Sequence, residues 1–228
     1  MVETMLRRGR RGDASRMQGA AVEYAAMGWP VCLGAVPRQH GSRRPSRAKP
    51  RDTGRACSCD RIGCPAPGAH PTSPAWQIEA SSDPAEVGRW WQERPRANII
   101  LVTGRAFDVL DVPAAAGTLA LARMDEAGAG PGPIALTADD RALFFVTTRG
   151  APASEDEWWS CHLDSEPDSF APVAGLRWHC RDSYVVGPPS RSDEGRAVYW
   201  IRDPKEHPLP DALRPLEFLA DACDEVMR

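Results

Sequence analysis

Four potential metal ligands lie within fourteen residues of the segment "CSCDRIGCPAPGAH": Cys57, Cys59, Cys64 and His70. Zinc prefers four tetrahedral sulfur and nitrogen ligands, and a loop without a core of its own becomes ordered when it binds the metal. Since four protein ligands leave no position for a catalytic water, the spacing predicts a structural zinc site. A reduced, metal-free loop is the other interpretation, and His40 is an alternative ligand.

The β-rich run "FDVLDV" carries the carboxylate of Asp111 near its end. Residues two apart on a strand share a face, so an Asp-x-Asp pair could hold divalent cations together. Here Pro113 occupies the second position, and Asp108, three residues earlier, should point to the opposite face. Asp111 alone is therefore either a metal ligand or an acid that caps a helix or turn.

Length and composition limit the class of protein. With 228 residues and 42% hydrophobic content, the chain can form one α/β or α+β domain with a small appendage. No uncharged apolar run approaches the length of a membrane span, and no apolar stretch follows the N-terminal arginines as in a signal peptide. Three clustered and four scattered cysteines do not resemble a disulfide framework, so we expect a reducing, cytoplasmic location without membrane attachment.

Charge is distributed unevenly along the chain. Through Arg55 there are 12 Lys or Arg against 4 Asp or Glu, and after it 16 against 27. Basic arms bind polyanions in many proteins, because a Debye length of roughly 8 Å lets clustered charges act together. A solvated, flexible arm is the alternative interpretation.

The pattern of turns and apolar residues predicts three regions: a disordered basic arm over 1–15, a main domain over 16–205 that contains a basic segment and metal loop at 38–75, and a C-terminal helix over 206–228. Helices should begin near Ser15 and after Asp83, an N-cap followed by Pro84 and Glu86. Short strands follow one another between flanking helices, which favours an α+β fold over a doubly wound parallel sheet. The predicted strands are "PVCLGAV", "NIILVTG", "FDVLDV", "PIALTAD", "ALFFVTT", "GLRWHC", "SYVVGPP" and "AVYWI".

Several segments, in order, resemble the N-terminal domain of bifunctional DNA primase/polymerases, the Prim-Pol branch of the archaeo-eukaryotic primases. They are "AAVEYAAMGWPV", "CSCDRIGCPAPGAHP", "DPAEVGRWWQERPRANIILVTG", "VLDV" and "YVVGPPS". The resemblance implies an RRM-like antiparallel or mixed sheet flanked by helices, with an inserted zinc loop. It also implies templated nucleotide joining in DNA replication, with Mg²⁺ or Mn²⁺ held by three carboxylates and a histidine near the phosphates.

The sequence departs from this family at the positions that carry the chemistry. Asp111 matches the first acid, but Pro113, Ala142 and Arg177 occupy the positions of the second acid, the histidine and the third acid. At an effective dielectric near 20, a guanidinium about 4 Å from a divalent ion costs roughly 8 kcal/mol before screening. Arg177 could instead hold a phosphate directly.

Two other pairs match family segments that line the nucleotide pocket: Thr103 with Gly104, and Ser190 with Arg191. The alternative is structural, since glycine permits a turn between strands and the preceding prolines end one. Trp76, Trp90 and Trp91 occupy positions where packing is favoured over base stacking.

Three functions follow from these observations. The first is a catalytically degenerate, zinc-containing Prim-Pol-like pseudoenzyme that binds a nucleotide or single-stranded or primer-template DNA. The second is an active DNA primase/polymerase with a rearranged metal site. The third is a regulator that binds a protein partner through the acidic insert 151–170, whose charge would repel a nucleic-acid backbone.

Overall fold

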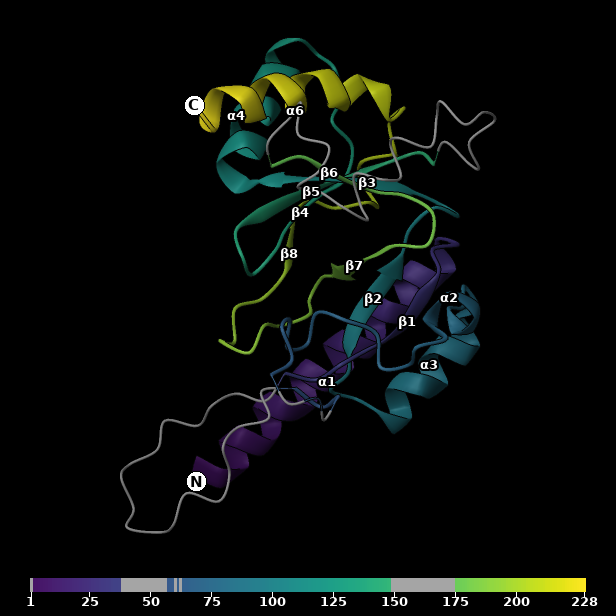
Figure 1. Cartoon of the computed structure of the whole chain (residues 1–228). Coiled ribbons are helices and arrows are strands. Elements are labelled where there is room, and N and C mark those ends of the chain that lie inside the picture. The colour runs from purple at the N-terminus through teal and green to yellow at the C-terminus, as the bar shows by residue number, and fades with distance from the viewer. Residues whose placement is uncertain (1, 38–56, 60, 62, 149–174) are drawn as a thin grey trace. The chain divides into compact units, whose positions relative to one another are not determined.

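The computed structural model describes residues 2–37, 57–59, 61, 63–148 and 175–228 (Figure 1). The acidic insert 151–170 and His40 lie outside these residues. The chain divides into two compact units, each built from two stretches of sequence. Unit 1 comprises Met1–Ile100 and Val186–Val198, and unit 2 comprises Leu101–Val185 and Tyr199–Arg228.

Unit 1 is organised around two packed helices, α1 (Val2–Ala26) and α3 (Pro84–Glu93). The side chain of Gln18 donates a hydrogen bond of 2.9 Å to the Gly88 carbonyl, which joins α1 to α3. α1 ends before Gly28, which has a φ of +80° that favours glycine.

The predicted start of α3 is confirmed. The Asp83 side chain accepts a 2.8 Å hydrogen bond from the backbone N–H of Ala85, and Pro84 is the first helical residue. The bond satisfies one of the four N–H groups that a helix leaves unpaired at its start. Trp91 is buried and donates to the Ala97 carbonyl, which ties the helix to the strand that follows.

A three-stranded sheet has the order β1 (Val31–Gly34), β2 (Asn98–Val102) and β7 (Tyr184–Gly187). All five residues of β2 are buried, as expected for the apolar run "IILV", and the buried amide of Asn98 before it is hydrogen-bonded. A short helix, α2 (Trp76–Glu79), was not predicted.

Unit 2 contains a five-stranded sheet whose strands are arranged in the order β6-β3-β5-β4-β8, and every pairing described within it for β3 and β4 is antiparallel. Helices α4 (Ala114–Glu126) and α6 (Leu213–Val226) pack on each other and against this sheet (Figure 1). The strands are β3 (Asp108–Pro113), β4 (Ile134–Leu136), β5 (Arg141–Val146), β6 (Arg177–His179) and β8 (Tyr199–Arg202).

The core of unit 2 lies between the helices and one face of this sheet. Leu110, Phe144 and Trp178 from the strands pack with Met124 and Leu219 from the helices. Because side chains alternate along a strand, the residues between them, including Asp111, belong to the other face. The alternation therefore separates an apolar, helix-covered face from a face that carries charged groups.

The predicted α+β class with antiparallel strands is confirmed. The helix α6 lies within the segment 206–228 that we expected to be helical but begins at Leu213. The start of the first helix also differs, because α1 begins at Val2 and includes the basic residues that we assigned to a disordered arm over 1–15. Leu, Met, Glu and Arg, all good helix formers, make up much of this segment, which explains the continuation of the helix.

Candidate functional site

Asp111 lies where three antiparallel strands place charged residues on one face. Its cross-strand partners are Leu143 on β5 and Arg177 on β6. Arg141 lies opposite Pro113, and His179 lies opposite Val109, so both share the face of Asp111 by the two-residue period of the strand. Register alone therefore brings two arginines and a histidine to a single carboxylate.

The Asp111 carboxylate is engaged on both oxygens. Arg141 Nε lies 2.6 Å from Oδ1, while His179 Nε2 and Arg177 Nη1 lie 3.2 Å and 4.0 Å from Oδ2. The side chains of Asp111 and Arg141 are 7% and 16% exposed, and that of Arg177 is 45% exposed. The ion pair of Asp111 and Arg141 is therefore the buried part of this cluster, and Arg177 lies on its solvent-exposed side.

Arg141 is fixed by more than the carboxylate. Its Nη2 donates to the backbone carbonyls of Asp111, at 3.1 Å, and Gly175, at 2.8 Å. The second ring nitrogen of His179 lies 3.1 Å from Ser183 Oγ. These additional bonds hold the Arg141 and His179 side chains in place beside Asp111.

The other family positions are placed differently from one another. Pro113 ends β3 and occupies the N-cap position of α4. Ala142 pairs with Val112, so its side chain lies on the helix-covered face, where it packs against Gly117. The structure therefore brings Arg177 to Asp111 and places the Ala142 side chain on the opposite face of the sheet.

Four other aspartates near these strands make no described contact with Asp111. Asp108 points away from the Asp111 face, as predicted, and accepts a 3.3 Å hydrogen bond from Trp178 Nε1. Asp139 and Asp140 lie in the turn between β4 and β5, and Asp182 lies in an exposed turn beside Arg181.

Sequence reasoning missed His179 and the role of Arg141. His179 belongs to the predicted strand "GLRWHC", and Arg141 directly precedes the predicted strand "ALFFVTT". Their distance along the chain from Asp111 hides the contact. The available signal was that His179 follows Arg177 by two residues on one strand and so shares its face.

Thr103 and Gly104 make structural contacts in unit 2. Thr103 Oγ1 donates to the Cys180 carbonyl at 2.5 Å, and its backbone N–H donates to Ser183. Gly104 has a φ of +81°, and a Cβ there would clash with the Arg181 backbone. The turn requires glycine for both reasons.

Ser190 and Arg191 belong to unit 1. Ser190 is fully buried, and its hydroxyl accepts a 2.8 Å hydrogen bond from the backbone N–H of Ile99. The backbone N–H and carbonyl of Arg191 both form hydrogen bonds with the Asn98 side-chain amide. The Arg191 side chain is exposed, and its Nη2 atom lies 3.7 Å from Asp13 Oδ1.

The predicted metal ligands come together in unit 1. One ligand atom from each of Cys57, Cys59, Cys64 and His70 lies within 4.8 Å of the others. His70 Nε2 lies 3.3 Å from Cys57 Sγ and 3.5 Å from Cys64 Sγ. The His70 Nδ1 atom lies 2.8 Å from the Pro71 carbonyl, and since a carbonyl oxygen can only accept, Nδ1 carries a proton.

The electrostatics of this group suit a cation. Burial by itself would raise the pKa of the Cys59 thiol, but hydrogen bonds from the Arg61 backbone and from Cys57, Cys64 and His70 lower it to about 7. Thiolate is the form that ligates metals. This Cys3His group can therefore bind a metal ion and is compatible with structural zinc.

The metal-ligand loop is attached to the strands of unit 1. Cys57 forms a β-bridge with Pro37, and the Ser58 side chain accepts a 2.8 Å hydrogen bond from the Val36 N–H. The Ala35 N–H donates to the His70 carbonyl at 2.8 Å. Both ends of the loop are thereby joined to the chain that continues from β1.

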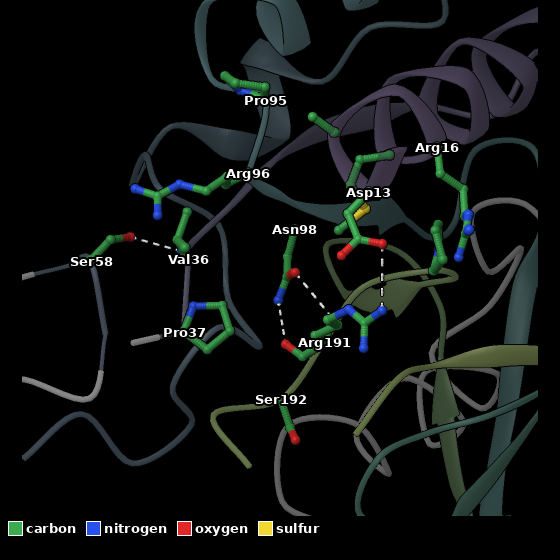
Figure 2. Close-up of a pocket in the computed structure, with 13 residues that line it drawn as sticks. Asp13, Arg16, Val36, Pro37, Ser58, Pro95, Arg96, Asn98, Arg191 and Ser192 are labelled. Carbon is green, nitrogen blue, oxygen red and sulfur yellow. Dashed lines mark hydrogen bonds and ion pairs between the residues drawn. The ribbon is translucent and has the colours of Figure 1, made fainter. Parts of the chain in front are cut away.

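A cavity of about 670 Å³ opens beside this loop in unit 1 (Figure 2). Ser58, Val36 and Pro37 line it on the side of the loop. The rest of the lining includes Asp13, Arg16, Arg96, Asn98, Arg191 and Ser192.

Within the part of the chain that the structure covers, no helix is long and apolar enough to cross a lipid bilayer.

Comparison with protein families gives a match. The model described as "Bifunctional DNA primase/polymerase, N-terminal" (Prim-Pol) matches residues 21–216, a range that contains Asp111, the two arginines and the histidine beside it, and the Cys3His group. A search of curated proteins finds no match for the chain.

Proposed function

Because the chain belongs to the Prim-Pol family, the N-terminal domains of bifunctional DNA primase/polymerases, we propose that it is a primase/polymerase-like protein that binds nucleic acid or nucleotides without joining them. One observation carries the proposal. The only family acid that the sequence retains, Asp111, is paired with Arg141 at 2.6 Å.

The residues around Asp111 do not fit a pair of divalent cations. Two-metal catalysis needs carboxylates that bridge and flank both ions. Here one buried carboxylate faces two guanidinium groups, and the neighbouring position on its face is Pro113. A cation entering this site would have to displace Arg141 from Asp111 and then tolerate the positive charge of Arg177.

The same groups support binding of phosphate. Arg177 is only weakly engaged by Asp111 at 4.0 Å, and its exposed guanidinium retains donors for an anionic ligand. A module of this kind holds a nucleotide or a strand by charge and hydrogen bonds rather than through bridging metal ions.

Two finer points belong to the same proposal. Cys57, Cys59, Cys64 and His70 bind structural zinc, which is supported by their soft donors and their mutual distances. The five-stranded sheet of unit 2 is the RRM-like sheet that the family resemblance implies, which is supported by its antiparallel strands and two packed helices.

Two measurements on the purified full chain test the function. Fluorescence anisotropy with labelled single-stranded and primer-template DNA at low salt should show binding, and competition with a nucleoside triphosphate should show whether nucleotides share it. Primer extension with Mg²⁺ or Mn²⁺ should give no product. Templated extension that Asp111→Asn abolishes would instead establish an active polymerase, and absence of both DNA and nucleotide binding would remove the proposed function.

A further inference from the structure

The cavity of unit 1 carries positive charge at its rim. Arg16 comes from α1, Arg96 from the turn before β2, and Arg191 from the segment after β7. Among the lining residues that the structure describes, Asp13 is the one acid. The rim thus has three guanidinium groups against one carboxylate, and its volume falls in the range of about 300–1,000 Å³ typical of ligand sites.

The three guanidinium groups are spread around the cavity. In Figure 2 they do not converge on one point, and Arg191 appears between Arg96 and Arg16. A single phosphate or a compact anion is held best by donors that converge on it. Separated arginines fit an extended ligand that carries charges at intervals, as the backbone of a nucleic acid does.

The lining between the arginines suits the rest of such a strand. Pro37, Pro95 and Pro189 contribute rigid apolar surface, and Ser58 and Ser192 contribute hydroxyl groups. Sugars and bases of a single strand can pack on apolar surface, whereas a duplex keeps its bases paired and inside.

Asn98 links this cavity to the metal-ligand loop. Its buried side-chain amide donates to the Gly68 carbonyl at 2.9 Å and to the Arg191 carbonyl at 2.8 Å, and its oxygen accepts from the Arg191 N–H at 3.1 Å. Ser58, between two of the metal ligands, lines the cavity directly. The conformation of the loop therefore sets both one wall and the position of Arg191.

We propose that this cavity binds the sugar-phosphate backbone of single-stranded nucleic acid, and that metal bound by Cys57, Cys59, Cys64 and His70 is required to shape it. The inference rests on the proposed function and assigns nucleic-acid binding to Arg16, Arg96 and Arg191 rather than to the cluster around Asp111. The bound metal would order the loop that forms one wall of the cavity.

The test is anisotropy of a labelled oligo-dT with the full chain over a series of salt concentrations. Arg16→Gln, Arg96→Gln and Arg191→Gln should each weaken binding about tenfold at low salt. Each should also reduce the slope of log affinity against log salt by about 0.7, the value for one lost phosphate contact on a single strand. Arg89→Gln removes an exposed arginine of α3 that does not line the cavity, and it should match the wild type.

Asp13→Asn should change the affinity in the opposite direction to the arginine variants. It removes the carboxylate 3.7 Å from Arg191 and should tighten binding by up to about fivefold. Binding should also fall when zinc is removed by a chelator and return when zinc alone is added back. The four substituted cavity residues are exposed, so their replacement removes no buried contact. Circular dichroism should confirm that the variants fold.

The outcomes separate the two proposals. If the wild type binds oligo-dT but the three cavity variants behave like Arg89→Gln, the cavity is not the site, although the proposed function stands. If the wild type binds a nucleoside triphosphate and no oligo-dT, the strand assignment is wrong. If it binds neither, both proposals fail. Binding that survives complete removal of zinc in the folded protein would overturn the role of the metal.

Discussion

The Nε atom of Arg141 lies 2.6 Å from Oδ1 of Asp111, although the two residues are 30 positions apart in the sequence. The antiparallel pairing of β3 with β5 creates this contact, because it places Arg141 opposite Pro113, on the face of Asp111. The guanidinium group of Arg141 therefore neutralises the buried carboxylate of Asp111. In the function proposed above, Asp111 corresponds to the first metal-binding acid of the family, and this ion pair occupies it in place of a metal.

The first prediction concerns this buried pair. Arg141→Met should lower the free energy of unfolding by about 3 kcal/mol, because it leaves a buried carboxylate without its main partner. Urea denaturation measures the change. Arg177→Met is the matched control, since this arginine is exposed and 4.0 Å from the same carboxylate, and it should change stability by less than about 1 kcal/mol.

The double variant Asp111→Asn with Arg141→Met should recover part of the loss, because neither charge is then buried alone. Equal stability losses for Arg141→Met and Arg177→Met would show that the buried ion pair contributes no more to the free energy of unfolding than the exposed arginine does.

The second prediction concerns the metal. Elemental analysis of the purified chain should find one zinc ion per molecule, and Cys59→Ser should abolish it. Zinc at a hundredfold excess over its dissociation constant should stabilise the wild type by about 2.7 kcal/mol and the variant by nothing. Cys32→Ala, which changes a buried cysteine outside the ligand group, should keep the ion. Equal zinc content in Cys59→Ser would exclude this set of ligands.

Local signals in the sequence were sufficient for the metal group and for the start of α3. The four ligands lie within one short segment, and the cap of Asp83 depends only on the next two residues. The strand that carries Asp111 was also predictable from its apolar pattern.

The cluster around Asp111 was not predictable, because it depends on register between strands that are distant in the sequence. Asp111 contacts residues 30 and 68 positions away, and nothing near it in the sequence indicates that Arg141 and His179 lie beside it on the neighbouring strands. The position of Ala142 on the other face follows from the same register. Tertiary pairing, rather than residue type, determined the chemistry of this site.

The third prediction concerns the helix cap. Asp83→Ala should destabilise the protein by about 1 kcal/mol, because it leaves the Ala85 N–H without its acceptor. Asp83→Asn keeps an acceptor oxygen and should have a much smaller effect. Urea denaturation at fixed salt provides the comparison, and two variants of equal stability would contradict a capping role.

The fourth prediction concerns stability at high pH. Burial, followed by the charge of Glu79, raises the pKa of the Cys32 thiol to about 12, and burial raises that of Cys223 to about 11, from an ordinary value near 9. Below pH 9 both thiols are protonated in the folded and the unfolded chain, so they contribute no pH dependence. Above pH 9 the unfolded chain loses protons that the folded chain retains, and stability should fall by up to about 1.4 kcal/mol per pH unit for each thiol.

Urea denaturation below and above pH 9 measures this slope. The double variant Cys32→Ala and Cys223→Ala should be less stable at neutral pH, because it leaves cavities in the core, but its stability should fall less steeply between pH 9 and 11. The difference in slope does not depend on the absolute stability of either protein. Parallel curves for the variant and the wild type above pH 9 would show that the two thiols ionise alike in the folded and unfolded chain.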